Sequence, residues 1–156
     1  MGKRRQRWQV GDVFLVRTKD GLDVVGQIVG RESTVLNSVS CAFYDKRLQD
    51  GDDIDVVELP GTRVFSVVFV TRDLLDNGTW RVVSHRPVTI PRNWLPYEHL
   101  RESGYVGAKV IGSRIVGEFL NAFYGLAPWD DWKDPAYLDG LLISPDKKPA
   151  KLVLKA

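Results

Sequence analysis

Three side chains in the sequence belong to the types that nucleophilic or acid–base catalysis uses most often: His85, His99 and Cys41. A catalytic nucleophile needs a base of near-neutral pKa within hydrogen-bond reach. His85 follows an expected strand and precedes Arg86-Pro87, where a hydrogen-bonded histidine is the more common role, and His99 has the same standing. Cys41 stands in an apolar stretch, where cysteine usually acts as a small buried hydrophobe. We therefore expect no catalytic residue among the three.

Metal and cofactor chemistry is equally hard to build from this composition. A tetrahedral zinc site needs several Cys and His ligands at close spacing, and one cysteine with two histidines cannot supply them. The sequence contains no P-loop, no GxGxxG and no nucleophile elbow, and its acids do not follow the EF-hand spacing. We expect no metal, no cofactor and no enzymatic activity. Carboxylate-dependent hydrolysis stays open as an alternative, because acids are plentiful and two could converge in a pocket.

An acidic segment is the first candidate for binding. Residues 45–58 hold six acids against Lys46 and Arg47. Such a surface suits a basic partner, because complementary charge speeds the encounter and fixes the register. A solvated surface loop is the plainer alternative. The candidate partner-binding carboxylates are Asp50, Asp52, Asp53 and Asp55.

A second candidate is the segment Pro128-Trp-Asp-Asp-Trp-Lys-Asp-Pro135, from which Trp129 and Asp131 join the partner-binding residues. Tryptophan is enriched at binding hot spots, since it buries a large area at little entropic cost. In the alternative interpretation, Trp129 and Trp132 close the core beneath a C-terminal helix, and their indole N–H groups reach polar partners. Both interpretations remain open at this point.

The basic start, Lys3-Arg-Arg-Gln-Arg-Trp8, could hold phosphates and stack a base on its tryptophan, although a solvated chain end is the commoner role. The net charge of +2 comes from 22 basic and 20 acidic residues. It predicts no global attraction to nucleic acid or membrane. The longest apolar runs are far shorter than the roughly 20 residues of a membrane span. No apolar stretch follows the basic start, so we expect no signal peptide. With a single cysteine, a cytoplasmic protein is expected.

The elements that must position these residues are mostly strands. With 156 residues, 44% of them hydrophobic, the chain is expected to form one domain, residues 1–156. Residues 13–16 and 22–29 predict a hairpin around Lys19-Asp-Gly21, and Gly26 indicates a bulge or a close backbone approach. Further strands are predicted at residues 39–44, 56–59, 64–70 and 80–83, with a polar loop at 45–55 and one helical turn at 71–75.

The C-terminal part has a different pattern. Pro87, Pro91 and Pro96 predict an ordered loop at residues 87–97. Ser113 is a candidate N-cap for a helix over residues 114–124 that Gly125 ends, and Pro135 could start a short helix reaching about residue 142. Residues 147–156 could form an edge strand or a loose end. The expected fold is α+β and predominantly β: a curved antiparallel sheet or small barrel in residues 9–90, followed by a loop and short helical part in residues 91–156. The expected core residues are Phe14, Val16, Val25, Ile28, Phe43, Val67 and Phe69.

A family resemblance covers residues 9–90. It rests on the order of Val10-Gly-Asp-Val-Phe-Leu-Val16, Lys19-Asp-Gly21, Gly26-Gln-Ile-Val29, Ala42-Phe-Tyr-Asp45, Val68-Phe-Val70 and Gly78-Thr-Trp80, followed by Val82 to Pro87. In this order the chain resembles the immunity protein 26 family. The resemblance implies a predominantly β protein, encoded beside a bacterial polymorphic toxin, that neutralises the toxin by binding it. It supplies no catalytic residues, and residues 91–156 extend beyond the short form of the family.

The expected function is therefore that of an immunity protein that binds a cognate toxin domain. The alternative is a nucleic-acid-binding small β-barrel module, which the basic start favours. The acidic loops and the lack of a concentrated basic stripe argue against nucleic acid. The sequence does not indicate an oligomeric state or a toxin.

Overall fold

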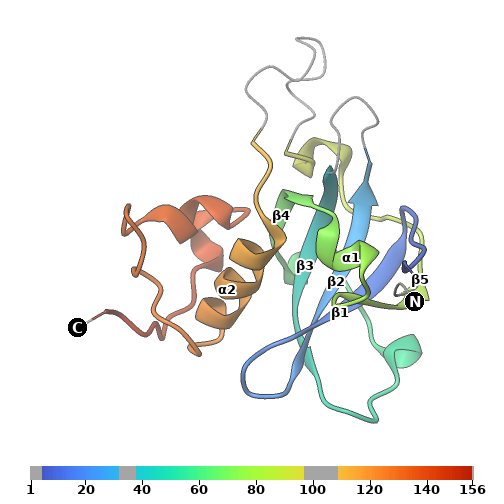
Figure 1. Cartoon of the computed structure of the whole chain (residues 1–156), viewed down its shortest axis with the longest axis horizontal. Helices are drawn as coiled ribbons and strands as arrows, with labels where there is room; N and C mark the ends of the chain where they lie inside the picture. Colours follow the sequence, from blue (N-terminus) through green and yellow to red (C-terminus); the bar gives the residue numbers. More distant parts are fainter. Residues whose placement is uncertain (1–4, 32–37, 97–108, 156) are drawn as a thin grey trace.

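The computed structural model describes residues 5–31, 38–96 and 109–155 and contains one open antiparallel sheet (Figure 1). Its strand order is β4-β3-β2-β1-β5, so β4 and β5 are the two edges and the sheet is not closed into a barrel. This confirms a predominantly β fold with a small helical part. The strands are β1 (Asp12–Arg17), β2 (Asp23–Gly30), β3 (Ser38–Leu48), β4 (Val64–Thr71) and β5 (Arg81–His85).

Two strand predictions were wrong in the same region. Residues 56–59 are not a strand; a 3-10 helix spans Ile54–Val56, and irregular backbone follows it. In turn, β3 runs four residues further than predicted, because Arg47 and Leu48 still pair with β2. Residues 45–48 therefore belong to the sheet, and the polar loop begins only after them.

Both faces of the sheet are buried, and all eight residues of β2 are buried. One face carries Phe14, whose ring stacks on Trp80 at 5.4 Å while Phe43 meets both rings edge-on. The other face carries Val13, Leu15 and Val25 beneath loop residues. Of the seven expected core residues, six are buried, whereas Val67 is only half-buried because it lies on the edge strand β4.

The buried side-chain amide of Gln27 links the central strand to the segments that lead into β1 and out of β5. Gln27 Nε2 donates to the carbonyls of Gly11 at 3.2 Å and Arg86 at 3.0 Å, and its Oε1 accepts from Tyr44 Oη at 3.4 Å. The chain before β1 and the chain after β5 are thereby held to the central strand β2. A buried polar group is stable only when it is bonded in this way.

The helices differ from the prediction at their starts. The helix α2 spans Ser113–Phe123 and is capped by Gly112, so Ser113 is its first residue rather than its N-cap. The Ser113 hydroxyl instead donates to Asp73 Oδ1 at 2.7 Å, which ties α2 to the short helix α1 (Asp73–Asp76). As predicted, Gly125 ends α2, with φ of +75°.

Short 3-10 helices replace most of the remaining predicted structure. The helix expected after Pro135 is a 3-10 helix at Tyr137–Leu141. Residues 147–156 form no strand within the described part; Val153 makes a single bridge to Pro128. Further 3-10 helices span Gly61–Arg63, Arg92–Trp94 and Pro145–Lys147. No helix in the described ranges combines the length and the apolar character that crossing a membrane requires.

The helix α2 and the chain after it pack against the same face as Trp80. The Phe65 ring of β4 stacks on Phe123 of α2 with 3.8 Å between centroids. Phe119, Trp129 and Leu138 are fully or almost fully buried in the same hydrophobic cluster as the sheet residues. In Figure 1 this C-terminal part lies beside the β4 edge, to the left of the sheet.

Because Gly26 has no side chain, the Phe14 ring can approach the backbone of β2 closely, as the sequence predicts for a glycine inside a strand. A methyl group on its Cα would lie 2.5 Å from Cζ of Phe14, inside the stacked aromatic core. We expect Gly26→Ala to lower the free energy of unfolding by about 1–3 kcal/mol, the usual cost of overpacking, in urea denaturation. Gly117→Ala is the matched control: it lies in α2 with nothing within 4 Å and should raise stability by up to about 1 kcal/mol. Equal stability of Gly26→Ala and wild type would contradict the Phe14 packing.

Candidate partner-binding surface

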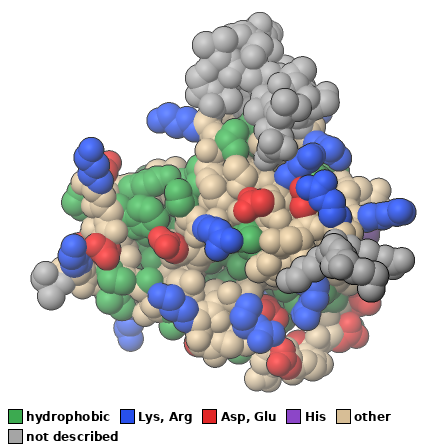
Figure 2. Space-filling model, in the orientation of Figure 1, with side chains coloured by type: hydrophobic (Ala, Val, Ile, Leu, Met, Phe, Trp, Pro, Cys, Tyr) green, Lys and Arg blue, Asp and Glu red, His purple; other side chains and the backbone are tan. Residues whose placement is uncertain are grey.

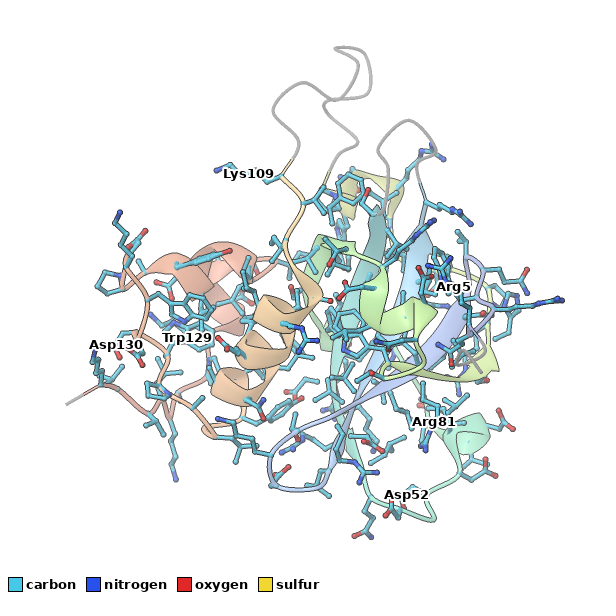
Figure 3. The ribbon with its side chains drawn as sticks, viewed as in Figure 1. Arg5, Asp52, Arg81, Lys109, Trp129 and Asp130 are labelled. Carbon is cyan, nitrogen blue, oxygen red and sulfur yellow. The ribbon has the colours of Figure 1, made fainter. Side chains whose placement is uncertain are left out.

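The acidic loop, defined here as residues 49–58, leaves β3 and projects from the lower end of the sheet (Figures 1 and 3). The four candidate carboxylates, those of Asp50, Asp52, Asp53 and Asp55, are all exposed. The structure thus brings the four together on one loop. Their proximity alone does not make a binding surface, so the way the loop is held decides what it can do.

Three of these carboxylates accept one hydrogen bond each, two of them from the backbone of the loop itself. Asp52 Oδ2 accepts from the backbone N–H of Gln49 at 2.9 Å, and Asp53 Oδ1 accepts from that of Asp55 at 3.0 Å. Asp55 Oδ1 accepts from the Ser84 hydroxyl of β5 at 3.2 Å. Each carboxylate is therefore oriented by its own bond and keeps further acceptor capacity for a partner.

Asp50 is partly neutralised. The Arg17 side chain donates to Asp50 at 2.9 Å and to Asp23 at 2.7 Å, and the hydrogen bond with Asp23 raises the pKa of Arg17. The Asp50 carboxylate is 81% exposed, so solvent and salt screen this pair strongly. Asp50 contributes less net charge to the loop surface than its neighbours.

The basic residue Arg47 does not offset the acids of the loop. Its guanidinium donates to the Thr18 hydroxyl at 2.6 Å and to Asp20 at 2.7 Å, and it lies 4.1 Å above the ring of Tyr124. The pKa of Asp20 is lowered to about 2, first by the hydrogen bond from Thr18 and further by Arg47. The charge of Arg47 is thus directed at Asp20 rather than at the acids of the loop.

Arg86 anchors the backbone of the acidic loop. Its guanidinium donates to the carbonyl oxygens of Ile54 at 2.5 Å and Val57 at 2.6 Å. The Arg86 carbonyl in turn accepts from the buried amide of Gln27. Ile54 and Val57 also pack against the hydrophobic cluster on this side of the sheet. The loop is therefore fixed before any partner arrives, which reduces the entropy lost on binding.

The exposed apolar side chain of Val56 lies among the acids, and the sequence did not predict it as part of the candidate surface. Val56 is 77% exposed, although its neighbours Ile54 and Val57 are partly buried. Three of the four residues in Ile54-Asp-Val-Val57 are apolar, and their order does not indicate which of them points outward. The strand predicted at residues 56–59 includes Val56.

Trp129 and Asp131 are not brought near the acidic loop. Trp129 is 2% exposed, its indole N–H donates to Asp139 Oδ1 at 2.7 Å, and its ring lies 5.9 Å from that of Phe119. This burial favours the interpretation of Trp129 as a core side chain. Asp131 is exposed and pairs with Lys155 at 3.1 Å. In Figure 3, Asp52 lies far across the molecule from Trp129 and Asp130.

His85 and Cys41, whose residue types could serve catalysis, make contacts typical of structural residues. His85 Nδ1 lies 2.8 Å from Asp12 Oδ1, which joins the end of β5 to the start of β1 and confirms a hydrogen-bonded histidine. Cys41 is completely buried, and burial raises the pKa of its thiol. His99 lies outside the described residues. Among residues 5–31, 38–96 and 109–155, no group of three or more His, Cys, Asp or Glu could hold a metal ion.

The described part of the basic start is engaged in internal contacts. Arg5 pairs with Asp76 at 3.3 Å, and the indole N–H of Trp8 donates to Asp76 at 2.8 Å while Arg31 lies over the Trp8 ring at 4.9 Å. Lys3 and Arg4 lie outside the described residues. On the face shown in Figure 2, basic and acidic side chains are interspersed rather than separated.

Comparison with known families identified a match. A family model described as Immunity protein 26 matches residues 9–105, more than half of the chain. The match includes all five strands, Gln27, the acidic loop and Arg86, and it extends beyond the expected residues 9–90. Comparisons with curated proteins and with solved structures gave no match.

The two hydrogen bonds that Arg86 donates to the loop predict what removing its side chain does. Arg86→Ala leaves the Val57 carbonyl without this donor and the Ile54 carbonyl with only the N–H of Val57, so we expect the free energy of unfolding to fall by about 1.5–3 kcal/mol. Backbone amides of residues 52–57 should also exchange faster with solvent, measured by hydrogen–deuterium exchange. Arg81→Ala, at an exposed arginine of the preceding strand β5, is the control and should change neither quantity. Unchanged exchange in the Arg86 variant would show that the loop is held by other contacts.

Proposed function

The chain belongs to the immunity protein 26 family, and on that premise we propose that it neutralises a cognate bacterial toxin domain by binding it through the acidic loop. Membership in an immunity protein family implies a toxin-neutralising role in general, and such families are generally non-catalytic. The finer proposal concerns which surface binds and what kind of partner it accepts.

The observation that carries this proposal is the fixed backbone of the loop beneath its exposed acids. Arg86 holds the carbonyls of Ile54 and Val57, while Asp52, Asp53 and Asp55 face solvent. A surface that is ordered before binding loses less entropy when it meets its partner. Its negative charge attracts a basic surface over a distance of about one Debye length, roughly 8–10 Å at physiological ionic strength.

The partner that this loop suits is a basic cleft with room for a small apolar group. Toxins that act on nucleic acid need basic active-site clefts, and the carboxylates of the loop would take the place of phosphates there. Val56 would be the apolar contact among them, since it is exposed at the same turn. Occupying the cleft would exclude the toxin's substrate without any reaction.

We also propose a cytoplasmic location and a single domain of residues 1–156. One lone, buried cysteine suits a reducing compartment. The sheet and the buried residues Trp129, Leu138 and Leu141 share one hydrophobic cluster, which supports treating the two parts of the chain as one domain.

Charge reversal on the loop tests the proposed surface. Against the toxin domain encoded by the neighbouring gene, Asp52→Lys with Asp53→Lys should slow association about tenfold at low ionic strength and weaken its dependence on salt. The matched control reverses Asp130 and Asp131, which gives the same change in net charge on the other side of the molecule. Surface plasmon resonance at low and high salt measures both. Equal slowing by the two double variants would contradict a role for the loop and point to net charge alone.

The non-catalytic part of the proposal has its own test. His85 bonds to Asp12, and the backbone N–H of Arg86 also donates to the Gly11 carbonyl at 2.9 Å, so the ends of β1 and β5 remain joined when the imidazole is removed. We expect His85→Ala to protect cells that express the toxin as well as the wild type does, in a co-expression viability assay. Circular dichroism must first establish that the variant folds. Loss of protection in a folded variant would mean that His85 acts in catalysis or lies in the interface.

A further inference from the structure

The edge strand β4 has a composition that favours pairing with other chains. Its eight residues, Val64-Phe-Ser-Val-Val-Phe-Val-Thr71, include six valines and phenylalanines and no charged residue, proline or glycine. Uncharged segments of this kind pair readily with identical segments of other molecules. The outer side of an edge strand offers a row of unpaired N–H and C=O groups for such pairing. An open β4 edge would therefore favour self-association.

The opposite edge strand, β5, is protected in another way. It has only five residues and begins with the exposed Arg81. The N–H of Val82 donates to the side-chain oxygen of Gln6 at 3.0 Å, and Gln6 Nε2 donates to the Trp80 carbonyl at 2.8 Å. Short length and charge are common means of keeping edge strands from pairing. The strand β4 is longer and uncharged, so it needs a cover made by other residues.

Two segments of the C-terminal part lie along β4 and bond to its outward backbone groups. Before α2, Ile111 donates to the carbonyl of Phe69 at 2.8 Å and accepts from the N–H of Thr71 at 3.0 Å. Close to the end of the chain, Ile143 donates to the carbonyl of Phe65 at 2.8 Å. Both segments thus occupy positions that the backbone of another chain would take on an open edge.

Residues 109–143, called the edge cover below, are also held to the sheet by side chains. The Phe123 ring of α2 stacks on Phe65 with 3.8 Å between centroids, and the buried Ser66 hydroxyl donates to the Leu141 carbonyl at 2.5 Å. In Figure 1 this part of the chain lies beside β4. The family match ends at residue 105, so the edge cover lies beyond the part of the chain that the family model describes.

We propose that the edge cover keeps the protein monomeric by preventing β4 from pairing with the β4 strand of a second copy. Two copies that met at this edge would form one continuous sheet. The outward groups of Phe65, Phe69 and Thr71 would then bond to the other copy instead of to Ile111 and Ile143. The C-terminal part thereby has a function of its own, which depends neither on the acidic loop nor on the identity of the toxin.

The first test measures how firmly the edge cover is held in the full-length wild type. The Thr71 amide bonds to Ile111 of the cover, whereas the amide of Val70 faces β3. In hydrogen exchange followed by NMR, we expect the Thr71 amide to exchange less than about 100-fold faster than the Val70 amide. A larger difference would mean that the cover opens readily and leaves the edge free, and it would overturn the proposal.

The second test removes the two N–H donors of the edge cover. Ile111→Pro with Ile143→Pro should make self-association at least about tenfold tighter than in the wild type, measured by sedimentation equilibrium. Ala150→Pro is the control, since Ala150 is exposed and its N–H makes no backbone bond in the part of the chain that the structure describes. It should stay monomeric. A double variant that folds, as judged by circular dichroism, and stays monomeric would overturn the proposal. If the double variant does not fold, the exchange measurement on the wild type decides.

A charge on β4 distinguishes pairing through this edge from association through exposed core residues. Val67 is half-buried on the edge strand, and a lysine there can extend its ammonium group to solvent. Adding Val67→Lys to the double proline variant should restore the monomer, because charged edges resist pairing. Thr79→Lys adds the same charge at an exposed residue before β5, at the opposite edge of the sheet, and should leave the association unchanged. Equal association with either lysine would show that the contact is not made through β4 and would overturn the proposal.

Discussion

The buried amide of Gln27 is the interaction on which the arrangement of this protein depends. It lies in the central strand β2, where a polar side chain is stable only if its hydrogen bonds are made. The carbonyls of Gly11 and Arg86 make those bonds, so the chain entering β1 and the chain leaving β5 converge on one point. Arg86, positioned there, reaches the acidic loop. The acidic loop is thus connected to the core through Arg86 and Gln27.

Much of the sheet could be predicted from the sequence because its strands are short apolar runs between turn residues. The hairpin around Gly21 and the strand after Gly61 are set by local patterns, and the structure has them within one or two residues. The strand predicted at residues 56–59 failed for a non-local reason. Three of its four residues are apolar, as in a short buried strand, yet Arg86, about 30 residues away, bonds to the carbonyls of Ile54 and Val57, and Ile54–Val56 form a 3-10 helix. Periodicity carries no information about such a partner.

The candidate binding surface could likewise be predicted from the sequence only in part. That Asp52, Asp53 and Asp55 are exposed follows from their residue type and from the lack of cations to pair with them. The rigidity of the loop does not follow, because it comes from Gln27 and Arg86. The role of a tryptophan cannot be assigned from the sequence, since the size of its side chain suits both a core and an interface. Trp129 and Trp132 are three residues apart, and only tertiary packing makes one buried and the other partly exposed.

The anchoring of the acidic loop has a consequence for how such a protein can diverge. Arg86 bonds to backbone carbonyls, and every amino acid has one, so this hold does not depend on the side chains that the loop displays. Substitutions at Asp52, Asp55 or Val56 would therefore change the surface that the loop presents while its path stays the same. Under the proposed function, a lineage of such proteins would follow changes in its toxins by exchanging a few surface residues on a constant scaffold.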